Sequence, residues 1–232
     1  MLWMKSWLET RWRLLYGLVI PLIALSLPYL MRPAGSRPIA DWRPALGVLG
    51  FFALFNAAYL AGAGIKTQSP FAAKKGVHGS LYYTLSLPVS RLRLLSVRAA
   101  AGFFEFAIAS ATMYSGFWLL SPAVRSSVTP LDLFANILAA TVSLACFYFV
   151  SVLLAIFLDD PWQTFGAIFL AMLTWSLVTR FTPPDRYNIF GFAGPASPLI
   201  SHTLPWPAMT ISLVVSAILF LSAWQIAERR EY

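Results

Sequence analysis

The sequence predicts an all-α, polytopic membrane protein with six transmembrane helices and an N-terminal interfacial amphipathic helix. Three observations lead to this fold class. The chain is 59% hydrophobic and 11% charged, whereas a soluble domain carries roughly 25% charged residues. Six apolar stretches approach or exceed the length of about 20 residues that a helix needs to cross a bilayer. The basic residues are also divided unequally among the connectors. One transmembrane domain is therefore expected over residues 1–232.

The first thirteen residues combine charges with three tryptophans. Lys5, Glu9 and Arg13 follow at i, i+4 spacing, so they share one helix face and can pair. Tryptophan favours the headgroup level of a membrane. Residues 1–13 are expected to form an interfacial helix on the cytoplasmic surface. The alternative is that they simply extend the first span.

The six expected spans follow one another with short polar or proline-rich connectors. In the third, fourth and sixth spans the apolar stretch is long, whereas the fifth is short. Pro161 suits the first position of the fifth helix, where its missing N–H costs nothing. Ala57 and Ala61 in the second span are small residues at helical spacing, which favours either contact with a second copy or internal packing. The expected spans are residues 14–30, 45–63, 96–120, 131–158, 162–179 and 207–227.

The basic residues favour a topology with both termini in the cytoplasm. Eleven basic residues, including all four lysines, fall on the side of the N-terminus, and six fall on the other side. Cytoplasmic connectors carry the excess of Lys and Arg in membrane proteins. The sequence therefore predicts a multi-pass protein of the cell membrane, in contact with lipid. The net charge of +8 is assigned to its surface loops and not to nucleic-acid binding.

The connector at residues 64–95 is expected to lie in the cytoplasm, and it is basic. The stretch 65–98 holds six basic residues and no acid. Gly62, Gly64 and Lys66 do not form a phosphate-binding loop, because that motif needs a different spacing after a strand. No nucleotide, metal or other cofactor site is expected in this chain, so ATP-driven work would need another subunit. Ser90 is expected to cap a helix that begins at Arg91.

The run 79–91, GSLYYTLSLPVSR, with Leu94 and Leu95, resembles the loop between the second and third spans of type-2 (ABC-2-type) ABC exporter permeases. In that family, a Leu-Pro-Val-Ser-Arg run follows the coupling helix. The likeness in motif covers about 30 residues, and the likeness in layout covers the chain. The family often has acids just before the glycine, where this chain has Lys74 and Lys75.

The resemblance implies a permease that works as a homodimer, or with a related permease, over ABC ATP-binding subunits. Phe71, Lys74, Lys75 and His78 match the coupling role, and Arg91 ends the coupling run. For Arg91, the alternative is anchoring at lipid headgroups. For His78, it is an exposed loop histidine. The resemblance also implies re-entrant helices that form an outer gate within the extracytoplasmic connector 180–206, whose residues 189–200 are apolar enough to enter the bilayer.

Glu105 is an acid inside the expected third span. An ionisable residue at that depth is costly and usually faces a partner, a cavity or an ion path. It is interpreted either as a substrate or proton contact, or as a buried group that is paired with an arginine such as Arg98 or is protonated.

Three functions are compatible with these features of the sequence. The first is an exporter permease, itself not an enzyme, that moves an amphipathic or lipid-like substrate by alternating access. The second is a membrane anchor or assembly factor without transport. The third is a lipid-modifying enzyme, whose candidate groups are Glu105, Asp132, Asp159, Asp160 and His202. These groups are expected at different depths and on different sides of the membrane, which argues against an enzyme.

Overall fold

The computed structural model describes residues 2–30, 42–61, 90–157, 161–181 and 187–229, and every element in these ranges is helical. The long helices are α1 (Leu2–Leu30), α2 (Arg43–Ala61), α5 (Arg91–Leu120), α9 (Pro161–Phe181) and α11 (Trp206–Arg229). Between them lie α6 (Pro122–Ser127), α7 (Pro130–Ser143), α8 (Ala145–Phe157), the 3-10 helix η2 (Ile189–Ala193) and α10 (Pro198–Ser201).

Four spans are long and apolar enough to cross a membrane. They are Arg43–Ala61, Leu92–Leu120, Pro130–Ala155 and Trp206–Ile226, and they correspond to the expected second, third, fourth and sixth spans. The expected first and fifth spans are helical, with shorter apolar stretches at Leu14–Ala24 and Gly166–Trp175. The all-α class is therefore confirmed, and four helices have the length and apolar composition that crossing a membrane requires.

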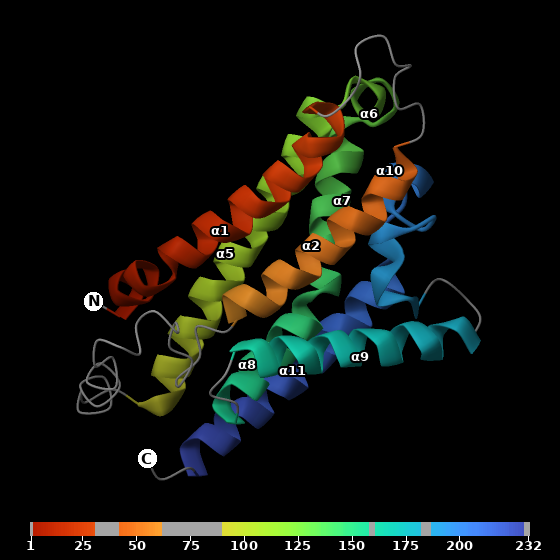
Figure 1. The fold of residues 1–232 in the computed structure, drawn as a ribbon. Coiled ribbons are helices and arrows are strands. Elements are labelled where there is room, and N and C mark those ends of the chain that lie inside the picture. Colours follow the sequence, from red (N-terminus) through yellow and green to blue (C-terminus); the bar gives the residue numbers. More distant parts are fainter. Residues whose placement is uncertain (1, 31–41, 62–89, 158–160, 182–186, 230–232) are drawn as a thin grey trace.

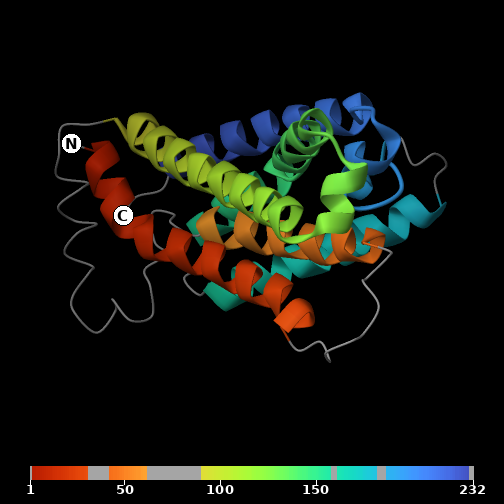
Figure 2. The same ribbon diagram turned by 90° about the horizontal axis from the view of Figure 1, so that it is seen from above.

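The helices form one elongated bundle. Both termini lie at one end of it, and α6 and α10 lie at the opposite end (Figure 1). Seen from above, α1 and α11 flank α5 on opposite sides (Figure 2), and α5 contacts both of them. The helix α9 packs on α8 and α2 and runs at a steep angle to α2 (Figure 1).

The N-terminal residues form no separate helix. Helix α1 runs from Leu2 to Leu30 as one helix, so residues 1–13 are continuous with the expected first span. The apolar stretch within α1 begins at Leu14. Exposed Trp3, Trp7 and Trp12 nevertheless keep these first turns suited to a headgroup layer.

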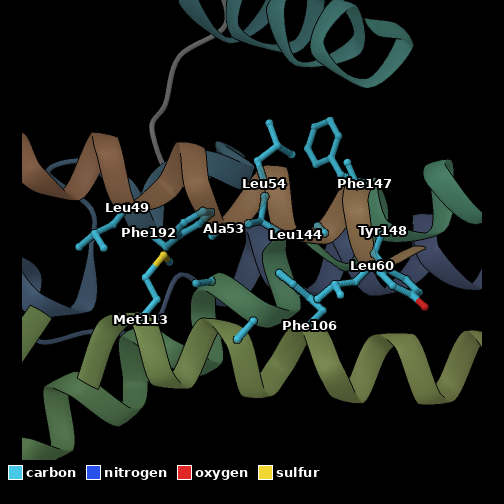
Figure 3. Packing of buried hydrophobic residues seen from close by; sticks show 14 of the residues in the cluster. Leu49, Ala53, Leu54, Leu60, Phe106, Met113, Leu144, Phe147, Tyr148 and Phe192 are labelled. Atoms are coloured by element: carbon cyan, nitrogen blue, oxygen red, sulfur yellow. The ribbon is translucent and has the colours of Figure 1, made fainter. Parts of the chain in front are cut away.

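The core is built where α2 meets α5 and α8. Ala57, Ala58 and Ala61 are buried inside the chain, so the small residues of α2 serve internal packing. Small residues let helix backbones approach closely in a membrane protein. Figure 3 shows Leu60, Phe106 and Tyr148 meeting beside this part of α2.

Gly102 makes the closest of these approaches possible. A Cβ atom at this position would lie 2.5 Å from the Tyr148 hydroxyl oxygen and 3.1 Å from the Leu60 carbonyl oxygen. The same hydroxyl donates a hydrogen bond of 2.8 Å to the carbonyl oxygen of Ala99. A side chain at position 102 would therefore force α2, α5 and α8 apart.

The expected fourth span, 131–158, is not one continuous helix. It breaks at Leu144 into α7 and α8, and a hydroxyl group from α11 fills the break. Ser212 Oγ accepts the N–H of Cys146 at 3.2 Å and lies 2.8 Å from the carbonyl oxygen of Val142. Insertion of a side chain into the helical hydrogen-bond ladder is a known cause of helix breaks, and here it ties α11 to the middle of the span.

Candidate functional site

The candidate site is the segment of residues 189–202, which follows α9 and carries η2 and α10. It packs on α7, α2 and α11. Ile189, Phe192, Pro198 and Leu199 are all buried. Two side chains shape it locally, since Asn188 accepts the N–H of Phe190 at 3.0 Å and Ser197 accepts the N–H of Leu199 at 3.2 Å. These hydrogen bonds cap the N-termini of its two short helices, η2 and α10.

The 189–202 segment runs alongside the fourth span. At one end, the ring of Phe190 lies 5.3 Å from the ring of Phe147 in α8. At the other end, His202 lies 3.0 Å from Asp132 in the first turn of α7. Asp132 and Phe147 are about four helical turns apart, on the order of 20 Å along a helix axis. The segment thus extends well along the apolar length of the protein.

Gly50 allows this close approach on α2. Its Cβ position would lie 2.5 Å from the Cβ of Ala193 and 3.6 Å from Cε2 of Phe192. Figure 3 shows Phe192 against Leu49 and Ala53 of the same helix. Irregular backbone is tolerated at membrane depth only where protein covers it or it lines a water-filled cavity, and here α2 and α7 provide protein cover.

A buried polar cluster, Tyr114, Asn136 and Ser197, joins the segment to the bundle. Ser197 Oγ donates a hydrogen bond of 2.8 Å to Asn136 Oδ1, and Tyr114 of α5 lies beside the Asn136 side chain. All three residues have a relative exposure of 0%. Polar groups in such a position are costly and usually have a function. The cluster connects α5, α7 and α10 at one point.

Asp132 holds a second connection, at the end of the bundle. Its Oδ2 accepts hydrogen bonds from the Thr129 hydroxyl at 2.7 Å and from the Thr129 N–H at 3.4 Å, which completes a capping box. Nδ1 of His202 approaches the same oxygen at 3.0 Å. His202 adopts a left-handed backbone conformation, with φ of 54°, as the C-cap of α10.

Asp132 and His202 are close neighbours, and the expectation that the candidate enzyme groups are scattered is wrong for this pair. The pair resembles the Asp–His part of a hydrolase triad, which also needs a nucleophile at the other imidazole nitrogen. Within the ranges that the structure describes, no hydroxyl or thiol bonds to His202 Nε2. No group of three metal-ligating side chains occurs in those ranges either.

Glu105 lies inside the bundle, with a relative exposure of 1%. Its carboxyl group is close enough to the Tyr148 hydroxyl to interact electrostatically. Aromatic rings line this region, including Phe106 with its ring 6.3 Å from that of Tyr148. The structure therefore buries Glu105 among side chains of α5 and α8, and both interpretations of its role stay open.

The expected coupling residues fall mostly outside the described residues. This applies to Phe71, Lys74, Lys75 and His78. Arg91 is the first residue of α5, and Ser90 caps that helix by accepting the N–H of Arg93 at 3.3 Å. The expected cap is thus confirmed. Arg91 and Glu105 are about four turns apart on α5, so they do not form one site.

Sequence reasoning did not select Tyr114, Asn136, Ser197 or Ser212. Asn136 carried a usable signal, because it is an amide inside an otherwise apolar span. The serines carried none, since serine is common in membrane helices and its role depends on a neighbour from another helix.

Comparison with known proteins gives no match. No protein-family model, no curated protein and no solved structure matches this chain.

Proposed function

We propose that this chain is the membrane-spanning subunit of an ATP-driven exporter of the type-2 ABC class. It would work as a homodimer, or with a related permease, over separate ATP-binding subunits. Its cargo would be amphipathic or lipid-like. The observation that carries this proposal is the junction at Ser90, where the Leu-Pro-Val-Ser-Arg run ends as the cap of a 30-residue helix.

Helix α5 is suited to carry movement from the basic connector to the far end of the bundle. It runs from Arg91 to Leu120, a length on the order of 45 Å. Its first turn is formed by the last residues of the connector, 91–95. Near its other end, Tyr114 meets Asn136, which accepts the hydrogen bond from Ser197. A tilt of α5 would therefore act on the 189–202 segment through packed side chains.

The 189–202 segment would form the barrier on the extracytoplasmic side. It is packed along α7, contacts α8 through Phe190 and Phe147, and is covered by α2. In this mechanism, ATP closes the two cytoplasmic subunits, the connector moves α5, and the segment leaves its position so that the pathway opens outward. Both termini lie at the end of the bundle opposite α6 and α10 (Figure 1), which supports placing them on the same side of the membrane.

The decisive experiment is purification of the chain from its own membrane, followed by identification of the proteins bound to it. We expect an ATP-binding subunit whose ATPase activity rises when both are placed in lipid bilayers. Reversing the charge of the connector, Lys74→Glu with Lys75→Glu, should weaken this binding. Arg125→Glu is a control for charge reversal elsewhere, because Arg125 is exposed on α6 at the opposite end of the bundle.

Each outcome separates the three candidate functions. Purified protein that binds no ATP-binding subunit would favour an anchor or assembly factor. Lipid cleavage lost on His202→Asn would favour an enzyme. Equal binding by the connector and control variants would remove Lys74 and Lys75 from the coupling role.

Glu105→Gln tests the buried carboxyl separately. Loss of transport with normal assembly would support a substrate or proton contact. Unchanged transport would leave Glu105 with a structural role.

A further inference from the structure

We propose that His202 and Asp132 form a proton-sensitive clasp that holds the 189–202 segment against α7, more tightly at acidic pH than at alkaline pH. The proposal goes beyond the function given above, because it concerns the position of the segment and holds for any activity of the protein. If the segment is an exporter's outer barrier, the clasp would make its release depend on the pH of the compartment that it faces.

The geometry of the pair suits a clasp. His202 Nδ1 lies 3.0 Å from Asp132 Oδ2, and the imidazole has a relative exposure of 60% against 13% for the carboxyl group. Asp132 is fixed by its capping box with Thr129. A partly buried, immobile acceptor thus meets a donor that solvent protons can reach.

The left-handed conformation of His202 is a second observation. It is the one non-glycine residue with positive φ among the residues that the structure describes. A side chain in this region is strained, and glycine or asparagine usually occupies a helix C-cap of this kind. Histidine is less favourable than glycine or asparagine in this backbone conformation, but it places an imidazole over the first turn of α7.

The charges around the pair are few. Helix α10 packs on α7, and Asp132 is the one charged residue of α7. Helix α10 itself carries no charged residue. Among the described residues, Asp132 makes an ion pair with His202 alone, although Arg43 and Arg125 lie on helices at the same end of the bundle (Figure 1).

Imidazole changes its charge between about pH 5 and pH 8. A neutral imidazole can still donate from Nδ1, but a protonated one adds a positive charge opposite the carboxylate. An ion pair with one exposed partner, at the strength measured for surface pairs, changes an equilibrium by about two- to five-fold. This modest strength suits a device that adjusts the segment while the buried Ser197–Asn136 bond keeps it in register.

The test is hydrogen exchange of peptides from residues 189–202, at pH 5.5 and pH 8.0, corrected for the intrinsic pH dependence of amide exchange. We expect about two- to five-fold greater protection at the lower pH. His202→Asn should remove this difference, because asparagine tolerates the left-handed conformation and lacks the charge. Asp132→Asn should remove it as well while leaving His202 in place. Peptides from the last turns of α11 serve as the internal control.

If the 189–202 segment of the wild-type protein opens too rarely for its hydrogen exchange to be measured, the same test can be made in a second variant. Ser197→Ala removes the buried hydrogen bond and should lower the protection of the segment at both pH values, with the same ratio between them. The proposal is overturned if wild-type protection has no pH dependence in either background. It is also overturned if the dependence persists in His202→Asn.

Discussion

The helices are held together by different kinds of contact at the two ends of the bundle. Toward the termini, α2, α5 and α8 meet through small residues and aromatic rings around Gly102, Leu60 and Tyr148. Toward α6 and α10, the 189–202 segment packs on α2 at Gly50 and is joined to α7 by individual polar pairs, namely Ser197 with Asn136 and His202 with Asp132. The first arrangement resists any displacement, because close packing leaves no room for it. The second can be released one pair at a time.

Gly102→Ala should have the largest effect and would test the packed end. The new methyl group meets both the Tyr148 hydroxyl and the Leu60 carbonyl, and overpacking of this kind costs about 3 kcal/mol at the upper end of its usual range. Thermal unfolding in detergent should show a clear loss of stability. Gly47→Ala is the matched control, since nothing lies within 4 Å of its Cβ position. Equal behaviour of the two variants would contradict the account of this end.

Gly50→Ala applies the same test to the segment. Its methyl group would meet Ala193, and we expect a cost of about 2 kcal/mol. The segment can shift outward, so the loss should appear mainly as faster hydrogen exchange in residues 189–202. Faster exchange throughout the bundle would instead show that the segment and the core unfold together.

Ser212→Ala probes the point between the two ends. It leaves the Cys146 N–H without its acceptor, and an unsatisfied buried donor costs about 1–3 kcal/mol. Ser212→Thr keeps the hydroxyl and should retain more of the stability. An alanine variant as stable as wild type would contradict this account. It would indicate that α7 and α8 join into one helix across Leu144 when the Ser212 hydroxyl is absent, and helical content measured by circular dichroism would then rise.

Thr129→Ala should have the smallest effect. It removes the N-cap of α7 and one hydrogen bond to Asp132, at a cost of about 1 kcal/mol. The segment should also lose protection, because Asp132 would no longer be fixed beneath His202. Ser126→Ala is the control, since Ser126 Oγ bonds within its own helix, to the carbonyl oxygen of Ala123. If Thr129→Ala and Ser126→Ala showed identical hydrogen exchange in residues 189–202, the cap at Thr129 would not contribute to the clasp between Asp132 and His202.

Individual residues show which parts of the fold could be predicted from the sequence alone. The apolar stretches predicted the long helices, because 20 apolar residues in lipid must satisfy their backbone hydrogen bonds as a helix. Ser90 and Pro161 predicted where α5 and α9 begin, since caps and first-turn prolines act locally. The break at Leu144 could not be predicted, because its cause, Ser212, is distant in sequence and near only in the folded protein.

The sequence by itself determined the helical class, the segments that form helices, the apolar length that would let four of them cross a membrane, and the basic character of the connector. These properties follow from composition and from interactions within a few residues. The tertiary structure alone decided that Asp132 meets His202, that Asn136 meets Ser197, and that Gly50 and Gly102 are sites of contact. Lipid tails are as apolar as the helix faces that they contact, so the hydrophobic pattern of a helix does not specify which helix it packs against. Close packing of small residues and pairing of polar side chains specify the partner instead.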